Sequence, residues 1–110
     1  MTAFENIVEA VKPFGYPYSP GVYEGEKKKY FTYNYADDRG GLYADNTPET
    51  TIASVQVHFF LPVKENFIKE KNQIRQALFQ QGFTYPEVTV LTENEEKIRH
   101  IVFECDIEEE

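Results

Sequence analysis

Two strand-like segments separated by a long polar segment place the strongest limits on how this chain can fold. Residues 29–36 form an aromatic run in which Phe31, Tyr33 and Tyr35 share one face, and residues 51–61 form a longer alternating run. A period of two is typical of strands that bury one face. The segment between them, residues 36–50, predicts a loop far longer than the usual connection of about 4–6 residues. A loop of this length indicates a contact surface.

The rest of the chain divides into two helices, two further strands and a second loop. Thr2 and Glu5 match a capping box, so we expect a helix over residues 3–12. Residues 64–81 carry a helical apolar stripe that ends at Gly82, a suitable left-handed stop. Residues 87–92 and 97–107 predict a hairpin. Residues 13–26 hold three prolines and three glycines and predict a long ordered loop.

The element order α-β-β-α-β-β predicts an α+β fold. We expect a two-layer sandwich in which both helices cover one face of a mainly antiparallel sheet. Residues 1–110 are expected to form a single domain, in which 108–110 is a frayed acidic tail.

The charge and cysteine content narrow the function classes. The net charge is −8, from 11 basic and 19 acidic residues, which disfavours direct nucleic-acid binding. No apolar run approaches the roughly 20 residues of a membrane span. Cys105 is the only cysteine, so an internal disulfide is excluded and synthesis in a reducing cytoplasm is expected.

The sequence offers no catalytic, metal or cofactor site. His58 and His100 lie on the outer face of their predicted strands and could meet across the sheet, but no cluster supplies further metal ligands. Cys105 alternates with apolar residues and is expected to be buried. The acids of the 36–50 loop do not match the spacing of a calcium-binding loop. We therefore expect a protein that is not an enzyme and binds no cofactor.

Tyrosine-rich and acidic positions in the two loops are the best candidates for a partner interface. The chain has eight tyrosines, and tyrosine is favoured at interfaces because it buries area while keeping a polar tip. Ordinary strand tyrosines are an equally good explanation. Lysines 27–29 are expected to discourage unwanted pairing at a strand edge. The candidate interface residues are Tyr16, Tyr18, Tyr23, Asp37, Asp38, Tyr43, Asp45 and Asn46.

Two short motifs resemble a group of small prophage-encoded proteins of Gram-positive bacteria. Residues 42–46 read Leu-Tyr-Ala-Asp-Asn, and residues 56–60 read Gln-Val-His-Phe-Phe within a long strand. The similarity continues through the second helix and the final hairpin. The chain thus resembles the tail-completion, or tail terminator, proteins of siphophage-type tails.

The resemblance implies a small α+β domain that assembles into a ring, often a hexamer, on the head-proximal end of the tail tube. It implies the major tail protein and the head–tail connector as partners, and the virion tail as location. A head-closure or tail-to-head joining protein is the neighbouring alternative. A monomeric acidic protein-binding module is the alternative from another class.

Overall fold

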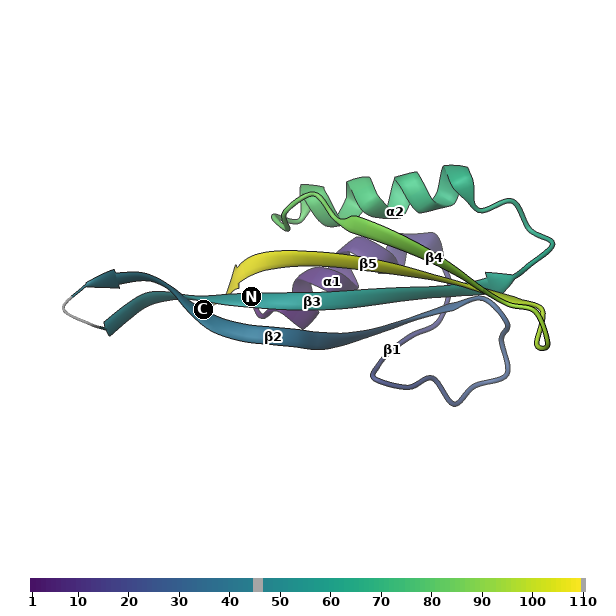
Figure 1. Cartoon of the computed structure of the whole chain (residues 1–110), viewed down its shortest axis with the longest axis horizontal. Coiled ribbons are helices and arrows are strands. Elements are labelled where there is room, and N and C mark those ends of the chain that lie inside the picture. The colour runs from purple at the N-terminus through teal and green to yellow at the C-terminus, as the bar shows by residue number, and fades with distance from the viewer. Residues whose placement is uncertain (45–46, 110) are drawn as a thin grey trace.

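The computed structural model describes the backbone of residues 1–44 and 47–109, and the side chains of these residues outside 39–49. The fold is α+β, with two helices and a mixed sheet of five strands in the order β1-β2-β3-β5-β4 (Figure 1). The α-helices are α1 (Ala3–Val11) and α2 (Ile68–Gln80). The strands are β1 (Tyr18–Pro20), β2 (Tyr30–Ala44), β3 (Thr47–Pro62), β4 (Glu87–Glu93) and β5 (Ile98–Glu109).

The predicted element order is incomplete, because the segment 13–26 is not simply a loop. A 3-10 turn, Lys12–Phe14, follows α1, and β1 then pairs in parallel with β2 at the sheet edge. Phe31 donates its backbone N–H to Pro17 at 2.8 Å, and Gly21 donates to Tyr33 at 2.9 Å. Pro20 is tolerated because proline is compatible with an edge strand. The other three strand pairings are antiparallel.

The predicted loop over residues 36–50 is wrong, because β2 and β3 continue through it as one long hairpin. Pairing runs from Tyr30–Phe60 out to Ala44–Thr47, with a register shift between Tyr35 and Asp37. The bulge absorbs one residue, so the pairing survives the polar and glycine-rich stretch that suggested a loop. Beyond the rest of the sheet, β2 and β3 pair only with each other and form an arm, visible at the left of Figure 1.

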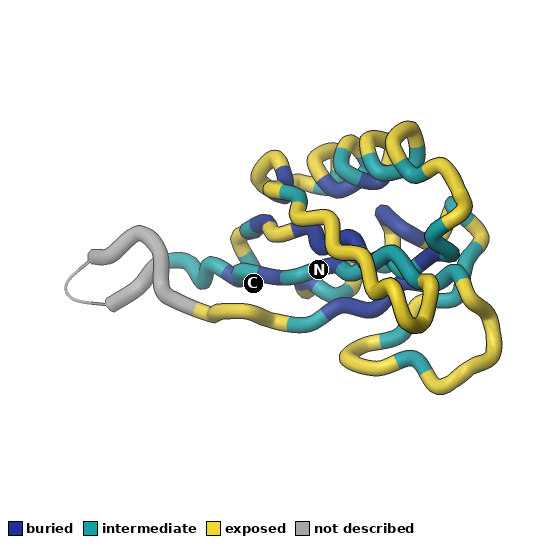
Figure 2. The backbone as a smooth tube through the Cα atoms, turned by 45° about the vertical axis from the view of Figure 1, so that its right-hand side comes forward, coloured by how far each residue is buried: buried dark blue, intermediate teal, exposed yellow. Residues whose placement is uncertain are grey.

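The core lies between the two helices and one face of the sheet. Ile7 and Val11 of α1 and Ile74 and Leu78 of α2 are buried in one cluster with the inward residues of the strands. In Figure 2 these buried stretches face each other across the helix–sheet contact. Phe31 and Tyr33 of the predicted aromatic face are buried, whereas Tyr35 on the same face is 41% exposed. The other buried strand residues of the core are Ala53, Val55, Val57, Phe59, Leu61, Ile101, Phe103, Cys105 and Ile107.

The helix ends follow their sequence signals. Thr2 and Glu5 form the expected capping box, and Gly82 adopts the left-handed conformation with φ 106° after α2. The helix α2 begins at Ile68 rather than at 64, because the chain first turns after Pro62. Asn66 then accepts a hydrogen bond from the backbone N–H of Ile68 through its side-chain oxygen.

The expected fraying of residues 108–110 is wrong for Glu108 and Glu109, which are ordered in the sheet. Glu109 belongs to β5, where it pairs with Thr51. Its carboxylate accepts hydrogen bonds from the backbone N–H of Ala3 at 2.6 Å and from the Tyr35 hydroxyl at 2.5 Å. A carboxylate is stabilised at the start of a helix, where free N–H groups and the helix dipole are positive. Residue 110 lies outside the described residues.

Candidate interaction surfaces

The arm formed by β2 and β3 extends beyond the last described pairing of β3 with β5. The last described pairing between β3 and β5 is Thr51–Glu109, whereas β2 and β3 remain paired to Ala44–Thr47. The molecule is consequently elongated, with extents of 54 × 24 × 21 Å and a radius of gyration of 15.0 Å. A compact chain of 100 residues has a radius of gyration of about 13 Å.

Three candidate interface residues of the 36–50 segment, Asp37, Asp38 and Tyr43, lie on this arm or at its base. Asp37 and Asp38 are exposed residues of β2, opposite Ser54 and Ala53. Tyr43 pairs with Pro48 through the backbone near the tip. Asp45 and Asn46 lie outside the described residues. The prediction that these positions contact a partner stays a prediction, now placed on a hairpin arm.

The three tyrosines of the 13–26 segment do not form one exposed patch. Tyr16 packs inward, with its ring centroid 5.8 Å from that of Phe59. Tyr23 stacks on Tyr30 at 4.4 Å and accepts a hydrogen bond from the backbone of Lys27. Tyr18 is 41% exposed. The structure therefore leaves Tyr18 as the most accessible of the three candidates.

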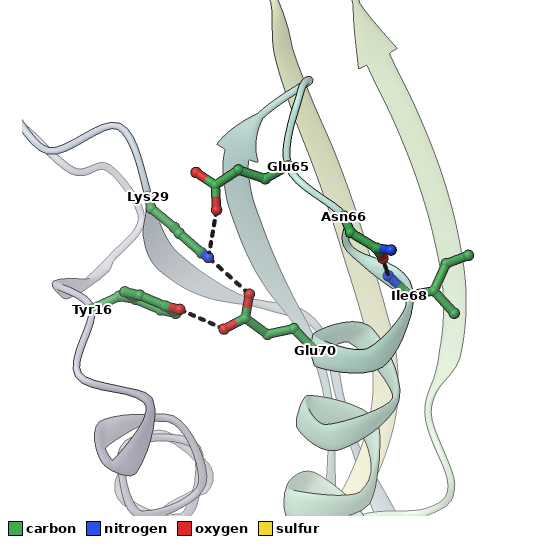
Figure 3. A network of polar contacts seen from close by, with 6 residues as sticks. All are labelled: Tyr16, Lys29, Glu65, Asn66, Ile68 and Glu70. Carbon is green, nitrogen blue, oxygen red and sulfur yellow. Dashed lines mark hydrogen bonds and ion pairs between the residues drawn. The ribbon is translucent and has the colours of Figure 1, made fainter.

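An ion-pair cluster of Tyr16, Lys29, Glu65 and Glu70, the Lys29 clamp, fastens the 13–29 segment to α2 (Figure 3). The Lys29 ammonium lies 2.9 Å from Glu65 and 3.0 Å from Glu70, and 4.7 Å from the centroid of the Tyr16 ring. The Tyr16 hydroxyl donates to Glu70 at 2.5 Å. Burial alone lowers the pKa of Lys29, but its hydrogen bonds to Glu65, Tyr16 and Glu70 outweigh burial and raise the pKa. Lys29 was expected to discourage pairing at a strand edge, but its ammonium instead forms ion pairs with Glu65 and Glu70.

Both outer strands of the sheet present edges without a strand partner among the described residues. The strand β4 pairs only with β5, and Val90 and Leu91 on it are 39% and 46% exposed. On the other side, β1 pairs with residues 31–33 of β2 only, so the rest of β2 has no strand beside its outer edge within the described range. Unpaired edges that carry apolar residues are templates for pairing with another chain.

The face of the sheet opposite the helices carries the two histidines, which do meet across strands. His58 Nε2 lies 2.8 Å from Asn34 Oδ1, and His58 Nδ1 lies 2.7 Å from His100 Nε2. Asn34 Nδ2 donates to Tyr35 and Gln56, so its Oδ1 is the acceptor for His58. A neutral His58 then carries its proton on Nε2 and accepts the His100 proton at Nδ1.

The electrostatics of the histidine pair favour the neutral form. Burial, and then the neighbouring His100, lower the pKa of His58, while burial lowers the pKa of His100. Cys105 is buried as expected, and burial raises the pKa of its thiol to about 12. A thiol in this state is a packing group rather than a nucleophile at neutral pH.

The hollows of the described surface contain no recognisable reaction centre. One of about 500 Å³ is lined by Ile52, Gly82, Thr84, Asp106, Ile107 and Glu108. Within the described ranges, no group of three or more His, Cys, Asp or Glu side chains is placed to hold a metal ion. None of the described helices is long and apolar enough to cross a membrane.

No protein-family model and no curated protein matches this chain.

Sequence reasoning missed the free edges and the histidine–asparagine chain. The edge of β4 could have been suspected from its run Val-Thr-Val-Leu-Thr bounded by Glu87 and Glu93. The contact of Asn34 with His58 depends on the register between β2 and β3, which no local pattern of residues indicates.

Proposed function

We propose that the chain is a non-enzymatic assembly subunit of a phage tail, a tail terminator that forms a ring on the head-proximal end of the tail tube. The observation that carries this proposal is the β2–β3 arm, whose described pairing continues past the last pairing of β3 with β5. A two-stranded hairpin is at best marginally stable alone in water. An arm of this kind gains stability when a neighbouring chain or the tube end covers it.

The two free edges supply the contacts that a ring requires. A closed ring needs two different, complementary side surfaces on each subunit. The exposed edge of β4 and the outer edge of β2 lie on opposite sides of the sheet. We propose that β4 of one subunit pairs with β2 of the next. A two-layer sandwich with a mainly antiparallel sheet suits a ring of this kind. In such a sandwich the helices cover one face of the sheet and leave the edges of β4 and β2 uncovered.

Charge makes the proposed assembly conditional. Glu87 and Glu93 border the apolar edge of β4, and the chain as a whole carries a charge of −8. Charged residues on an edge strand and a large net charge both oppose uncontrolled association. The free protein is expected to remain soluble until the tube end offers compensating contacts. The proposed partners are a second copy, the major tail protein and the connector, with the virion tail as location.

A variant with a shortened arm tests this proposal. Residues 41–50 are replaced by Asn-Gly, a favoured two-residue hairpin turn, so that Gly40 and Thr51 close the hairpin. The control keeps the arm and carries Glu24→Gln and Glu26→Gln, because the deletion also removes two acidic residues, Asp45 and Glu49.

The readout is binding to purified tail tubes, by co-sedimentation and electron microscopy of tube ends. We expect the control to cap tube ends and the shortened variant to fold but leave the ends bare. Equal capping by both variants would show that the arm has no role in assembly. Binding of the unmodified chain to purified connectors but not to tubes would favour the head-closure or joining protein instead.

A further inference from the structure

The open face of the sheet, opposite the helices, carries a continuous apolar band. Tyr30, Phe60, His100 and Leu91 lie directly opposite one another on β2, β3, β5 and β4. The ring centroids of Tyr30 and Phe60 are 4.7 Å apart, and those of Phe60 and His100 are 4.2 Å apart. Tyr23 extends the row at one end by stacking on Tyr30. No described helix covers this band, although its members are apolar or aromatic.

The same face is acidic around the band. Alternation along β4 and β5 places Glu87, Glu93, Glu104 and Glu108 on it. No Lys or Arg occupies an outward position on β3, β4, β5 or residues 30–34 of β2. Glu87 lies directly opposite Glu104, and both are exposed. Like charges at directly opposed positions destabilise a sheet, so this pair is unfavourable in the free chain.

We propose that the open face binds a basic segment of a partner protein. An apolar side chain of that segment covers Leu91 and the Phe60–His100 part of the band, while its Lys or Arg groups pair with Glu87 and Glu104. A cation placed between these two carboxylates removes their repulsion and adds charge-assisted hydrogen bonds. Electrostatic complementarity of this kind selects the partner and rejects like-charged surfaces.

Charge argues against the two other occupants of this face. A second copy docked face to face would bring two sets of the same carboxylates together. Nucleic acid would meet the same repulsion from its phosphates. The proposal does not depend on ring formation, because the open face is separate from the arm and the binding is measured on the free chain.

The test uses a synthetic peptide, acetyl-Arg-Leu-Arg-Trp-Arg-Leu-Arg-amide, titrated into isotopically labelled chain and followed by NMR. An all-arginine heptapeptide controls for charge alone. The chain is studied unmodified, as Glu87→Gln/Glu104→Gln, as Leu91→Ser, and as the matched variant Glu24→Gln/Glu26→Gln. Both double variants change the net charge by the same amount, and the four glutamates and Leu91 are all exposed.

We expect saturable shifts at backbone amides of residues 58–60, 87–91 and 100–104 with the apolar basic peptide. The Glu87/Glu104 variant should bind at least about threefold more weakly, as for loss of surface ion pairs, and the Glu24/Glu26 variant should be unaffected. Leu91→Ser should also weaken binding. Shifts located elsewhere, equal binding of the all-arginine peptide, equal weakening by both double variants, or concentration-dependent self-association through this face would each overturn the proposal.

Discussion

The Lys29 clamp makes a quantitative prediction about what holds the 13–29 segment to α2. In the variant Lys29→Met, the aliphatic stem that covers the Tyr16 ring is kept and the ammonium is removed. The Lys29 side chain is 21% exposed and Glu70 is 20% exposed, so this pair is partly shielded from water, whereas Glu65 is 45% exposed. Hydrogen bonds to charged groups contribute roughly 1.5–3 kcal/mol. Part of this is offset because a buried ammonium no longer has to be desolvated.

We expect Lys29→Met to lower the free energy of unfolding by about 2 kcal/mol. For a domain near this size, 1 kcal/mol corresponds to about 4–8 °C in Tm, so Tm should fall by roughly 10 °C. Lys12→Met is the matched control, because Lys12 also pairs with a glutamate at 2.7 Å, but with both side chains nearly half exposed. Its effect should stay below about 0.5 kcal/mol.

The assay is urea unfolding of the two variants and the unmodified chain, with Tm measured in parallel. Hydrogen exchange should also accelerate over the first turn of α2 and over residues 15–18 in Lys29→Met. If Lys29→Met lowers the free energy of unfolding no more than Lys12→Met does, the Lys29 clamp is no stronger than an ordinary surface ion pair and this prediction is wrong.

Three further predictions follow from individual side chains. Cys105 should react with iodoacetamide at pH 8 far more slowly in the folded chain than in urea, and rapid labelling of the folded chain would contradict its burial. Stability should decline above pH 9, because the pKa of the thiol is near 9.0 in the unfolded chain and about 12 in the folded chain. Stability should fall as the pH drops through about 6.5, because the unfolded histidines bind protons there while the pKa values of His58 and His100 are lower in the folded chain. Urea unfolding of a His58→Asn/His100→Gln variant tests this. If the variant keeps the same pH dependence of stability, the histidine pair does not cause it. Gly82→Ala should lower the free energy of unfolding in urea by about 1–2 kcal/mol, because φ of 106° is strained for alanine. A clash does not contribute, since the added Cβ would lie 3.7 Å from Ile107, an ordinary contact distance. No change in stability would show that the backbone relaxes.

The parts of the fold that local chemistry determines could be predicted from the sequence. The capping box at Thr2, the stop at Gly82 and the inward alternation of β3 and β5 depend on neighbouring residues only. Each of these patterns favours the same local structure that the tertiary contacts stabilise. These elements were placed within a few residues of their observed bounds.

The arm and the first strand depended on longer-range pairing. Residues 36–50 contain Gly40, Gly41 and several acids, and these residue types are depleted in strands. Gly40 and Gly41 nonetheless pair with Thr51 and Thr50, because the register of β2 and β3 is already set by contacts such as Phe31–Phe59 and continues past the bulge. Likewise β1 is a strand only because β2 offers it an edge.

The candidate interface was predicted in part. Tyrosine composition alone could not separate Tyr18, which is exposed, from Tyr16, whose hydroxyl reaches Glu70 across 54 positions of sequence. The acidic open face depends on the pairing of β4 with β5, because this pairing places Glu87 opposite Glu104.

The most direct test of the proposed ring is the mass in solution, measured by light scattering over a concentration series, first for the chain alone and then with purified tail tubes. We expect either a closed ring or a monomer of 12.8 kDa that converts to a ring on tube ends. A strict monomer that ignores tube ends at every concentration would contradict it, and the chain would then be better described as a monomeric binding module.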